Sequence, residues 1–468
     1  MADKYRDFMD HVRLCAEKFR LSDNSKPIRL VSHIDADGIS SCSIMVKTLN
    51  IQNRKYSIST IQNLTRDAIE DLSKEPCQII IFTDIGSGQI RAINELLAGK
   101  EVIILDHHLT EDIKLAKNIS HINPNLFGYD GGSEISGAGV TYLFCRELEP
   151  RIRGMAHIAV VGALGDVQRF NSLNQEILND AIAEGNLKII KGLRIFGAQT
   201  RPLHKVLEYS TDPYIPGVTG SESGSIQFLQ QLGINPKSGS SWKKIVHLVP
   251  DEIKKLVSGI IMKRFGEKKP EDVLGDVYLL PKEESESPFR DAREFATLLN
   301  ATGRMGKASL GIGSCLGDKK NKELAVRNLI AYKKEIINAL EWFEKNRGTN
   351  NVIKGEGYAI INAGNNVKHT IVGTLASIIS KSNKMDADYL LSIARMEDGF
   401  SKASLRYAKR DECDLQSIMK EITSGLEGCE SGGHMQAAGA VIPSSLEHIF
   451  IKRAQEILRK KGMEEVIT

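Results

Sequence analysis

Acidic and histidine side chains recur early in the chain, each time directly after an apolar run. The four stretches that carry them are His33-Ile34-Asp35-Ala36-Asp37, Thr83-Asp84, Asp106-His107-His108 and Gly165-Asp166. Carboxylate oxygens and imidazole nitrogens bind divalent cations, and two ions held about 3.5–4 Å apart clamp the attacking and leaving oxygens of a displacement at phosphorus. The sequence therefore predicts a two-metal centre for phosphoryl chemistry.

The first stretch places a metal-ligand type at every second position, at His33, Asp35 and Asp37. In an extended backbone, residues two apart point the same way and their Cα atoms lie about 6.6 Å apart. We therefore expect these side chains to line one face, which suits two ions with one bridging carboxylate. Imidazole and carboxylate without thiolate favour Mn²⁺ or Mg²⁺ over structural zinc, and the imidazoles favour Mn²⁺.

A structural role is the alternative for each stretch taken singly. An aspartate that follows a strand usually caps a helix or closes a turn, as Asp37 before Gly38 would. Four such stretches at equivalent strand ends favour metal ligands instead. We expect the other histidines to be structural, because no suitably spaced acids flank them: His121 in a polar loop, His157 in an apolar stretch, and His11, His204, His247, His369 and His448.

Parallel strands alternating with helices are predicted to position these residues. Apolar runs at 28–32, 78–82 and 102–105 are typical of buried strands, and the intervening segments have helical spacing. A further apolar run, 155–164, precedes Asp166. Ligands of an open parallel sheet bind at the carboxyl ends of its strands, so the four stretches are expected at one rim.

The length of 468 residues predicts two to three domains. Residues 1–191 are interpreted as the α/β domain that carries the four stretches. The alternation of strands and helices lapses over 192–288, which predicts a helical insert with a linker. Beyond a long helix at 321–345 the alternation resumes, so 289–468 is interpreted as a smaller α/β domain.

Composition excludes several classes of protein. Hydrophobic residues make up 41% of the chain and the net charge is +3, from 62 Lys and Arg against 59 Asp and Glu, which argues against a disordered or strongly basic protein. The seven cysteines form no C-x-x-C pair, which argues against a zinc ribbon or a disulfide framework. No apolar run approaches the roughly 20 residues that a spanning helix needs, so we expect a cytoplasmic protein without a membrane partner.

The four stretches, in this order, resemble the four motifs of the DHH phosphoesterase superfamily, whose name comes from the triplet Asp106-His107-His108. Segments 300–304 and 431–439 resemble motifs of the DHH-associated C-terminal domain of RecJ-type nucleases. Within the superfamily, segments 134–139 and 290–300 and the insert resemble archaeal RecJ-like exonucleases of the GINS-associated type. This resemblance implies an active-site cleft between two lobes.

The resemblance also implies a role for each site residue. One metal would be held by His33, Asp35 and Asp84. The other would be held by Asp37, Asp84, His107 and Asp166, so that Asp84 bridges the two ions. In catalysis, Asp106 would fix the tautomer of a neighbouring histidine, and His108 would contact the scissile phosphate or protonate the leaving oxygen. The implied substrate-binding residues are Asn300, Arg304, Arg406, Gly432, Gly433 and His434.

The function that the resemblance implies is hydrolysis of single-stranded DNA or RNA from an end, in replication or repair. The insert carries no metal motif and is expected to bind a replication complex of the GINS type. Three alternatives stay open: a replication scaffold with residual nuclease activity, a phosphodiesterase of small oligonucleotides or cyclic dinucleotides, and an inorganic pyrophosphatase. The insert and segment 300–304 argue against the last of these.

Overall fold

The computed structural model describes residues 2–210, 213–267, 269–381, 385–409, 413–434 and 437–467, without the side chains of residues 2, 434 and 464–467. The chain divides into two compact units, Met1–Leu329 and Ile330–Thr468. The limit between the units falls within one long helix, α13 (Lys319–Asn346). The predicted domain limits at 191/192 and 288/289 are not marked by this division and stay predictions.

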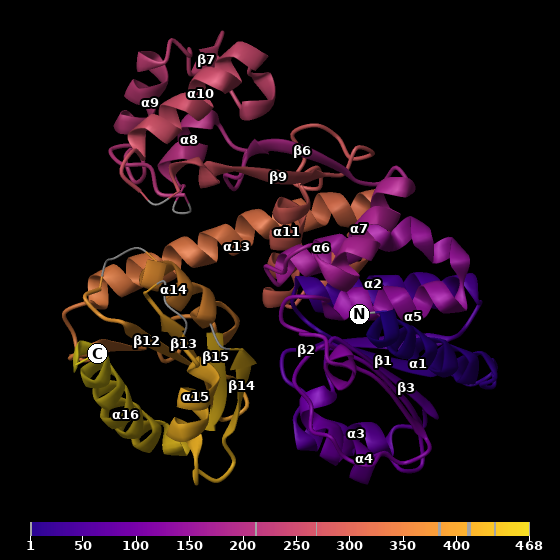
Figure 1. Cartoon of the computed structure of the whole chain (residues 1–468). Coiled ribbons are helices and arrows are strands. Elements are labelled where there is room, and N and C mark those ends of the chain that lie inside the picture. The colour runs from indigo at the N-terminus through magenta and orange to yellow at the C-terminus, as the bar shows by residue number, and fades with distance from the viewer. Residues whose placement is uncertain are drawn as a thin grey trace. The chain divides into compact units, whose positions relative to one another are not determined.

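A five-stranded parallel sheet, in the order β2-β1-β3-β4-β5, forms the centre of the first unit (Figure 1). Its strands are β1 (Ile28–His33), β2 (Tyr56–Ile61), β3 (Ile79–Thr83), β4 (Glu101–Leu105) and β5 (Ile119–Ile122). Every residue of β3 is buried, as expected for a central strand covered by helices on both faces. The predicted α/β class with a parallel sheet is confirmed.

Helices cover both faces of this sheet. Apolar residues of α3 and α4 pack on one face, in a cluster with β1, β3 and β4, and α1, α2 and α5 lie on the other (Figure 1). The helices are α1 (Ala2–Arg20), α2 (Ala36–Ile51), α3 (Arg66–Lys74), α4 (Ile90–Leu96), α5 (Gly137–Leu148), α6 (Ala156–Gly165) and α7 (Ser172–Ala183). The short 3-10 turns are η1 (Ser87–Gln89), η2 (Pro124–Phe127) and η3 (Pro150–Met155).

The apolar run before Asp166 forms the helix α6 and not a strand, so the prediction that all four stretches follow strands is wrong for the fourth. Residues of α6 are buried nearly all round, because the helix packs among α2, α5, α7 and α11. A helix buried on every side has no polar face, and its sequence then resembles that of a buried strand.

Strands frame the insert, which is therefore not wholly helical. β6 (Lys188–Leu193) pairs antiparallel with β9 (Leu274–Leu279), and the other elements lie between them in the sequence (Figure 1). These elements are α8 (Leu203–Glu208), α9 (Glu222–Gln231), β7 (Lys237–Ser238), β8 (Ser241–Trp242), η4 (Ile245–His247), α10 (Pro250–Lys263) and η5 (Pro270–Val273). The insert has its own apolar core, which includes Leu203, Phe228 and Leu256.

Two helices follow the insert within the first unit, α11 (Ala292–Arg304) and α12 (Ala308–Cys315). α11 packs against α2 and α6, the two helices that carry or precede metal-ligand candidates. The segment 300–304 thus belongs to the same compact unit as the four stretches.

The second unit is built on a six-stranded mixed sheet in the order β10-β11-β12-β13-β15-β14. Its strands are β10 (Val352–Gly355), β11 (Tyr358–Asn362), β12 (Tyr389–Arg395), β13 (Phe400–Tyr407), β14 (Glu430–His434) and β15 (Ala437–Pro443). Its helices are α14 (His369–Lys381), α15 (Leu415–Thr423) and α16 (Glu447–Ile467), with a 3-10 turn η6 (Ser444–Leu446). Leu415, Ile418, Phe450 and Leu458 of α15 and α16 pack against this sheet.

Among the described residues, no helix combines the length and the apolar character that crossing a membrane requires.

Candidate metal centre

The first stretch forms a turn from strand to helix. His33 ends β1, and Asp35 caps α2 by accepting a hydrogen bond from the Gly38 amide (2.9 Å). Asp37 already lies in the first helical turn. The predicted extended backbone is therefore wrong beyond His33, because Asp35 is a good N-cap residue and starts the helix.

This turn sends the three side chains to two places. Asp35 Oδ2 lies 2.9 Å from His33 Nδ1, whereas Asp37 joins a different group with His107 and Asp166. The first turn of α5 fixes the Asp37 carboxylate, since the Gly137 amide donates to Oδ2 (2.6 Å) and the Ala138 amide donates to Oδ1 (3.0 Å). Helix N-termini favour negative charge, which explains how a fully buried aspartate is held there.

Asp84 follows β3 and lies between the two groups. Its Oδ2 is 3.4 Å from His33 Nδ1, and its Oδ1 is 3.2 Å from His107 Nε2. The side chain is 1% exposed, and neither oxygen accepts a hydrogen bond from a described residue. A buried carboxylate whose two oxygens accept no such hydrogen bond carries a large desolvation penalty, which a bound cation would offset.

The backbone of Asp84 is in the left-handed region, with φ of 61°. This conformation costs a residue with a Cβ atom about 1–3 kcal/mol and typically persists at functional sites. Gly137 contributes to the placement of Asp84, since a Cβ atom on residue 137 would collide with Asp84 Oδ1.

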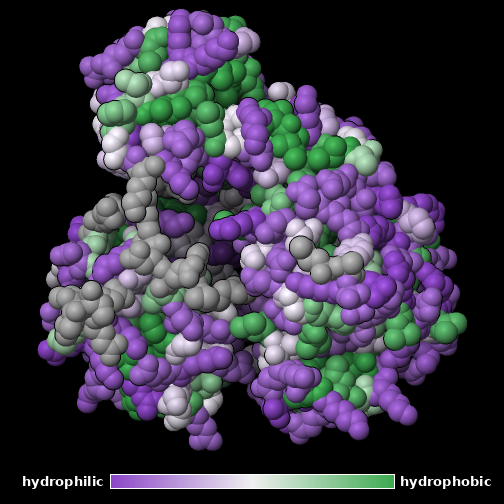
Figure 2. Space-filling model, in the orientation of Figure 1, coloured by the Kyte–Doolittle hydropathy of each residue, from purple (hydrophilic) through white to green (hydrophobic). Residues whose placement is uncertain are grey.

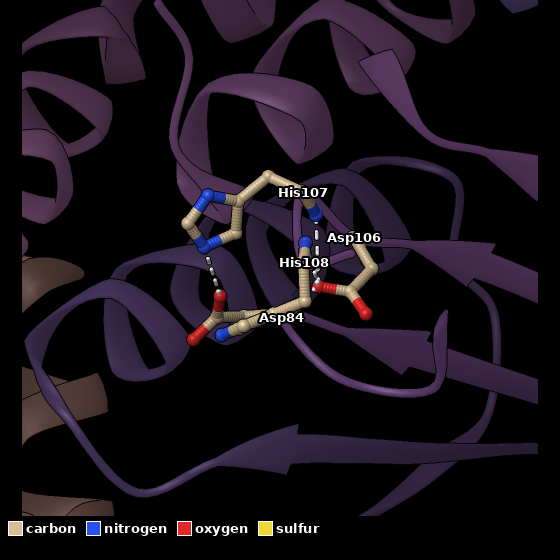
Figure 3. A group of neighbouring side chains, drawn as sticks. All are labelled: Asp84, Asp106, His107 and His108. Carbon is tan, nitrogen blue, oxygen red and sulfur yellow. Dashed lines mark hydrogen bonds and ion pairs between the residues drawn. The ribbon is translucent and has the colours of Figure 1, made fainter. Parts of the chain in front are cut away.

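Asp106 accepts hydrogen bonds that order the histidine pair (Figure 3). Its Oδ2 accepts from the Ser87 amide (2.8 Å), and its Oδ1 accepts from the His107 amide (2.8 Å) and the His108 amide (3.2 Å). The same Oδ1 lies 2.7 Å from His108 Nδ1. This geometry suits a carboxylate that positions a histidine rather than one that binds a metal directly.

His107 turns its Nε2 toward the carboxylates. Its Nδ1 lies 2.6 Å from the Gly131 carbonyl oxygen, which can only accept, so Nδ1 carries the proton. Nε2 therefore faces Asp84, where it could offer a lone pair to a cation, and lies 3.4 Å from Asp166 Oδ2 and 3.7 Å from Asp37 Oδ2. Histidines that bind metals almost always donate their other N–H in this way.

The electrostatics of the cluster favour the binding of a cation. Burial, followed by the neighbouring charge of Asp84, raises the pKa of Asp37 to about 7. Burial, followed by the charge of Asp37, raises the pKa of Asp166 well above its usual range. Burial opposes a charge on His33 and His107, yet the surrounding carboxylates outweigh it and raise the pKa of both imidazoles. A divalent cation would relieve the repulsion among the carboxylates.

The donor set therefore fits a divalent cation. Two groups of three side chains have ligand atoms within 4.8 Å of one another: His33, Asp35 and Asp84, and Asp37, His107 and Asp166. Asp84, Asp106, His107 and His108 form a further group of this kind. The structure thus brings all eight predicted catalytic and metal residues together, and the role of each stays a prediction.

Adding Mn²⁺ is expected to raise the melting temperature of the metal-free protein by about 5 °C at an ion concentration of 100 times Kd. Binding removes the repulsion among buried carboxylates in the folded state only. Differential scanning calorimetry in EDTA and in Mn²⁺ measures this shift. The control is Asp84→Asn, which should lose most of the increase, and equal melting temperatures of the wild type with and without Mn²⁺ would contradict the assignment.

Two predicted substrate-binding residues lie near the first stretch. Asn300 Oδ1 accepts a hydrogen bond from the Ala36 amide (3.0 Å), so this side chain supports the start of α2. Arg304 is the last residue of α11. Between them, a Cβ atom on Gly303 would collide with the Ile34 carbonyl oxygen, which shows how closely α11 packs on the turn.

The other predicted substrate-binding residues belong to the second unit. Arg406 lies in β13 and donates from Nε to Ser377 Oγ (2.8 Å) and from Nη1 to the Leu405 carbonyl (2.8 Å). Gly432 and Gly433 lie in β14, and the sheet register aligns Arg406, Ala437 and His434 across three neighbouring strands. The side chain of His434 lies outside the described part of the chain.

Several residues around the centre were missed by the sequence reasoning. The amides of Gly137 and Ala138 hold Asp37, and the signal for them was the N-cap Ser136 before a run of small residues. His121 was predicted in a polar loop, which is wrong. It lies in β5 with 4% exposure, and its ring approaches Ser87 Oγ within 2.9 Å.

Comparison with known proteins agrees with this arrangement. The model of the DHH family, N-terminal domain, matches residues 27–164, the DHH-CID domain matches 195–276, and the DHHA1 domain matches 355–460. An uncharacterized protein of Methanocaldococcus jannaschii is 33% identical over 446 residues, which cover 92% of this chain and 93% of the relative. The fold and the family define a hydrolase. The chain belongs to the DHH family and has a RecJ-like fold.

Solved structures share this fold at low sequence identity. RecJ in complex with Mn²⁺ from Thermus thermophilus has a TM-score of 0.58 at 17% identity, over 97% of this chain and 55% of that chain. The chain thus spans about half the length of that RecJ. CDC45 from Entamoeba histolytica has a TM-score of 0.62 at 10% identity, over 97% of this chain and 99% of that chain. A further structure, exonuclease RecJ bound to manganese, has a TM-score of 0.55 at 17% identity, over 96% of this chain and 94% of that chain.

Proposed function

We propose that the protein is a metal-dependent exonuclease that hydrolyses phosphodiester bonds of single-stranded nucleic acid by a two-metal mechanism. The observation that carries this proposal is the position of Asp84, whose two oxygens face two separate groups of candidate ligands. The structural similarity to RecJ, crystallised with Mn²⁺ and with Mg²⁺, supports both the reaction class and the type of ion.

The proposed reaction assigns metal binding and proton transfer to different residues of the centre. His33, Asp35 and Asp84 would hold one ion, and Asp37, Asp84, His107 and Asp166 the other. Two bound ions supply Lewis acidity and lower the pKa of a water molecule at the scissile phosphorus. Asp106 accepts from His108 Nδ1, so the Nε2 proton of the charged imidazole is the one transferred to the leaving oxygen. Burial opposes the charge on His108, but Asp106 outweighs it and raises the pKa of this imidazole.

Residues outside the metal centre would bind the strand. Arg406 offers a planar fork to a phosphate, and the glycine pair Gly432 and Gly433 permits close approach of the backbone to another. Neither glycine carries a Cβ atom, and Gly433 has φ of 135°, a conformation that disfavours other residues. Asn300, Arg304 and His434 complete the proposed set.

A ladder assay tests this function directly. End-labelled single-stranded DNA and RNA of graded lengths are incubated with Mn²⁺, with Mg²⁺ and with EDTA. The proposal predicts stepwise shortening from one end with metal, none with EDTA, and little cleavage of a blunt duplex. Failure to shorten any single strand in either metal would contradict it.

The similarity to CDC45 supports a second candidate, a scaffold subunit of a replication complex. All eight metal-ligand and DHH-triplet positions of the motifs hold an acid or a histidine, with Asp106 in the positioning role, which favours retained catalysis. The ladder assay separates the candidates, because a scaffold would leave strands uncut at enzyme concentrations that bind them. A third candidate, a phosphodiesterase of very short oligonucleotides, predicts that cleavage falls sharply beyond a few nucleotides.

We further propose that the insert binds a replication complex of the GINS type through an apolar groove between α9 and α10. The groove encloses about 550 Å³ and is lined by Phe228, Leu232, Gly259 and Met262, with Lys255 and Lys263 at its rim. Hydrophobic side chains gather on this part of the insert in Figure 2. Met262 is 70% exposed and the nearby Phe265 86%, which is unusual unless a partner covers them.

Met262→Glu is expected to lower capture of a purified GINS-type complex by about tenfold, because it places a charge in the apolar groove. Cleavage of free single strands should be unchanged, since the groove lies outside the metal centre. The matched control is Ile182→Glu, an exposed apolar position of α7 outside the insert. Unchanged capture by Met262→Glu would remove the groove from the proposed interface.

A further inference from the structure

An arginine on the insert lies between two exposed aromatic rings. The Arg201 guanidinium carbon is 5.2 Å from the ring centre of Phe196 and 5.6 Å from that of Tyr209. Phe196 comes three residues after β6, and Tyr209 directly follows α8. Phe196 is 43% exposed and Tyr209 56% exposed, so both rings remain accessible to a ligand. We call these three residues the aromatic–arginine site.

The charge of this site is not neutralised by the insert. Neighbouring basic residues are paired, as in Lys191 with Asp276 (2.7 Å) and Lys205 with Glu208 (2.8 Å). By contrast, neither Arg201 nor the exposed Arg194 forms an ion pair with a carboxylate in the described part of the chain. An arginine that forms no such ion pair and lies beside aromatic rings can bind an external anion.

Glu294 is the acid that most influences Arg201, but its oxygens are engaged elsewhere. One oxygen accepts from Thr200 Oγ1 (2.5 Å) and the other from the Gln199 amide (3.1 Å). Burial lowers the pKa of Arg201, and the charge of Glu294 offsets this in part. The guanidinium therefore sits in a partly desolvated place where a phosphate would be bound more strongly than in open water.

Glycine residues preorganise the site. Gly197 has φ of 85°, and a Cβ atom on it would lie 2.7 Å from Arg201 Cδ. The stem of Arg201 thus lies directly on the backbone, which limits its rotamers before any ligand arrives. Arg194 is placed similarly, because a Cβ atom on Gly275 would collide with its Cδ atom. Less side-chain entropy is then lost on binding.

Aromatic contacts connect the base of the insert to the metal centre within the same compact unit. Phe170, four residues after Asp166, packs on Tyr278 of β9, with ring centres 4.7 Å apart. β9 pairs with β6, the strand that leads to the aromatic–arginine site (Figure 1). The strand pair β6 and β9 thus links the segment after Asp166 to the insert within one compact unit.

We infer that the aromatic–arginine site binds single-stranded nucleic acid at a distance from the metal centre, with bases on Phe196 and Tyr209 and a phosphate on Arg201. Stacking on aromatic rings accepts every base, and the planar guanidinium binds phosphate through two parallel hydrogen bonds. The inference rests on the proposed nuclease function for its class of ligand. An acidic protein partner is the competing occupant, and the experiment below distinguishes the two.

The test measures binding of fluorescein-labelled oligonucleotides by anisotropy in EDTA, where cleavage is absent. The probes are deoxythymidine oligomers of about 4 and about 25 nucleotides, because an OB-fold-sized strand contact covers about 4–16 nucleotides. The variants are Arg201→Ala, Arg201→Lys and the double change Phe196→Ala with Tyr209→Ala. The control is Lys254→Ala with Lys269→Ala, two exposed cations of the insert that do not line the groove between α9 and α10.

The inference predicts that Arg201→Ala and the aromatic double variant weaken binding of the long oligomer at least about fivefold, and leave the short one unchanged. Arg201→Lys should recover part of the affinity because it keeps the charge, and the control should match the wild type. Equal affinities of all variants for the long oligomer would overturn the inference. So would loss of GINS-type complex capture with unchanged oligonucleotide binding, which would indicate a protein interface. If the wild type cuts no strand yet shows this length dependence, the proposed nuclease function fails while the binding site stands.

Discussion

Replacing Asp84 with asparagine is expected to lower turnover by about 10³-fold while the protein stays folded. Asp84 faces both groups of candidate ligands, so the change weakens both ion sites at once. Asparagine keeps the size of the side chain and tolerates the left-handed backbone at this position, which alanine would not. Turnover is measured on a single-stranded oligonucleotide in Mn²⁺, with circular dichroism as the check on folding.

The comparison with His33→Ala makes this experiment decisive. His33 belongs to one group of candidate ligands, so its loss should cost less than the loss of Asp84. Equal losses in the two variants would argue that Asp84 serves one ion only. Near-native turnover of Asp84→Asn would contradict the two-metal assignment altogether.

Gly137→Ala is expected to lower turnover by about 100-fold, although Gly137 is neither a proposed ligand nor a catalytic residue. An added Cβ atom would collide with Asp84 Oδ1, and the shift would also displace the amide that donates to Asp37. Because alanine is the better helix former, propensity alone predicts a small gain in stability instead. The loss therefore reports on the metal centre.

Gly154→Ala is the matched control, since a Cβ atom there would meet no atom within 4 Å. It should keep native turnover and Mn²⁺ affinity. Isothermal titration with Mn²⁺ should give a weaker affinity for Gly137→Ala than for this control. Wild-type affinity and turnover of Gly137→Ala would show that the α5 terminus does not shape the centre.

The sequence allowed the parallel sheet and the gathering of the four stretches to be predicted. The strands β3 and β4 are nearly continuous apolar runs. Asp84 directly follows β3, and Asp106 directly follows β4. Since parallel strands end at the same edge of the sheet, their position in the sequence largely determines their position in space.

Other features could not be predicted because they depend on tertiary contacts. The helix α6 has no polar face, so periodicity could not distinguish it from a strand. The group that Asp37 joins depends on the amides of α5, which lie a hundred residues away in the sequence. The strands β6 and β9 pair with each other but are separated in the sequence by the other elements of the insert, so no local sequence pattern predicts their pairing.

The central claim is that Asp84 joins two metal ions, and anomalous diffraction at the manganese edge tests it most directly. Crystals of the wild type grown with Mn²⁺ should show two peaks about 3.5–4 Å apart, on either side of the Asp84 carboxylate. Crystals of Asp84→Asn should lose one or both peaks. Two peaks at full occupancy in Asp84→Asn, or a single peak in the wild type at saturating Mn²⁺, would contradict the account.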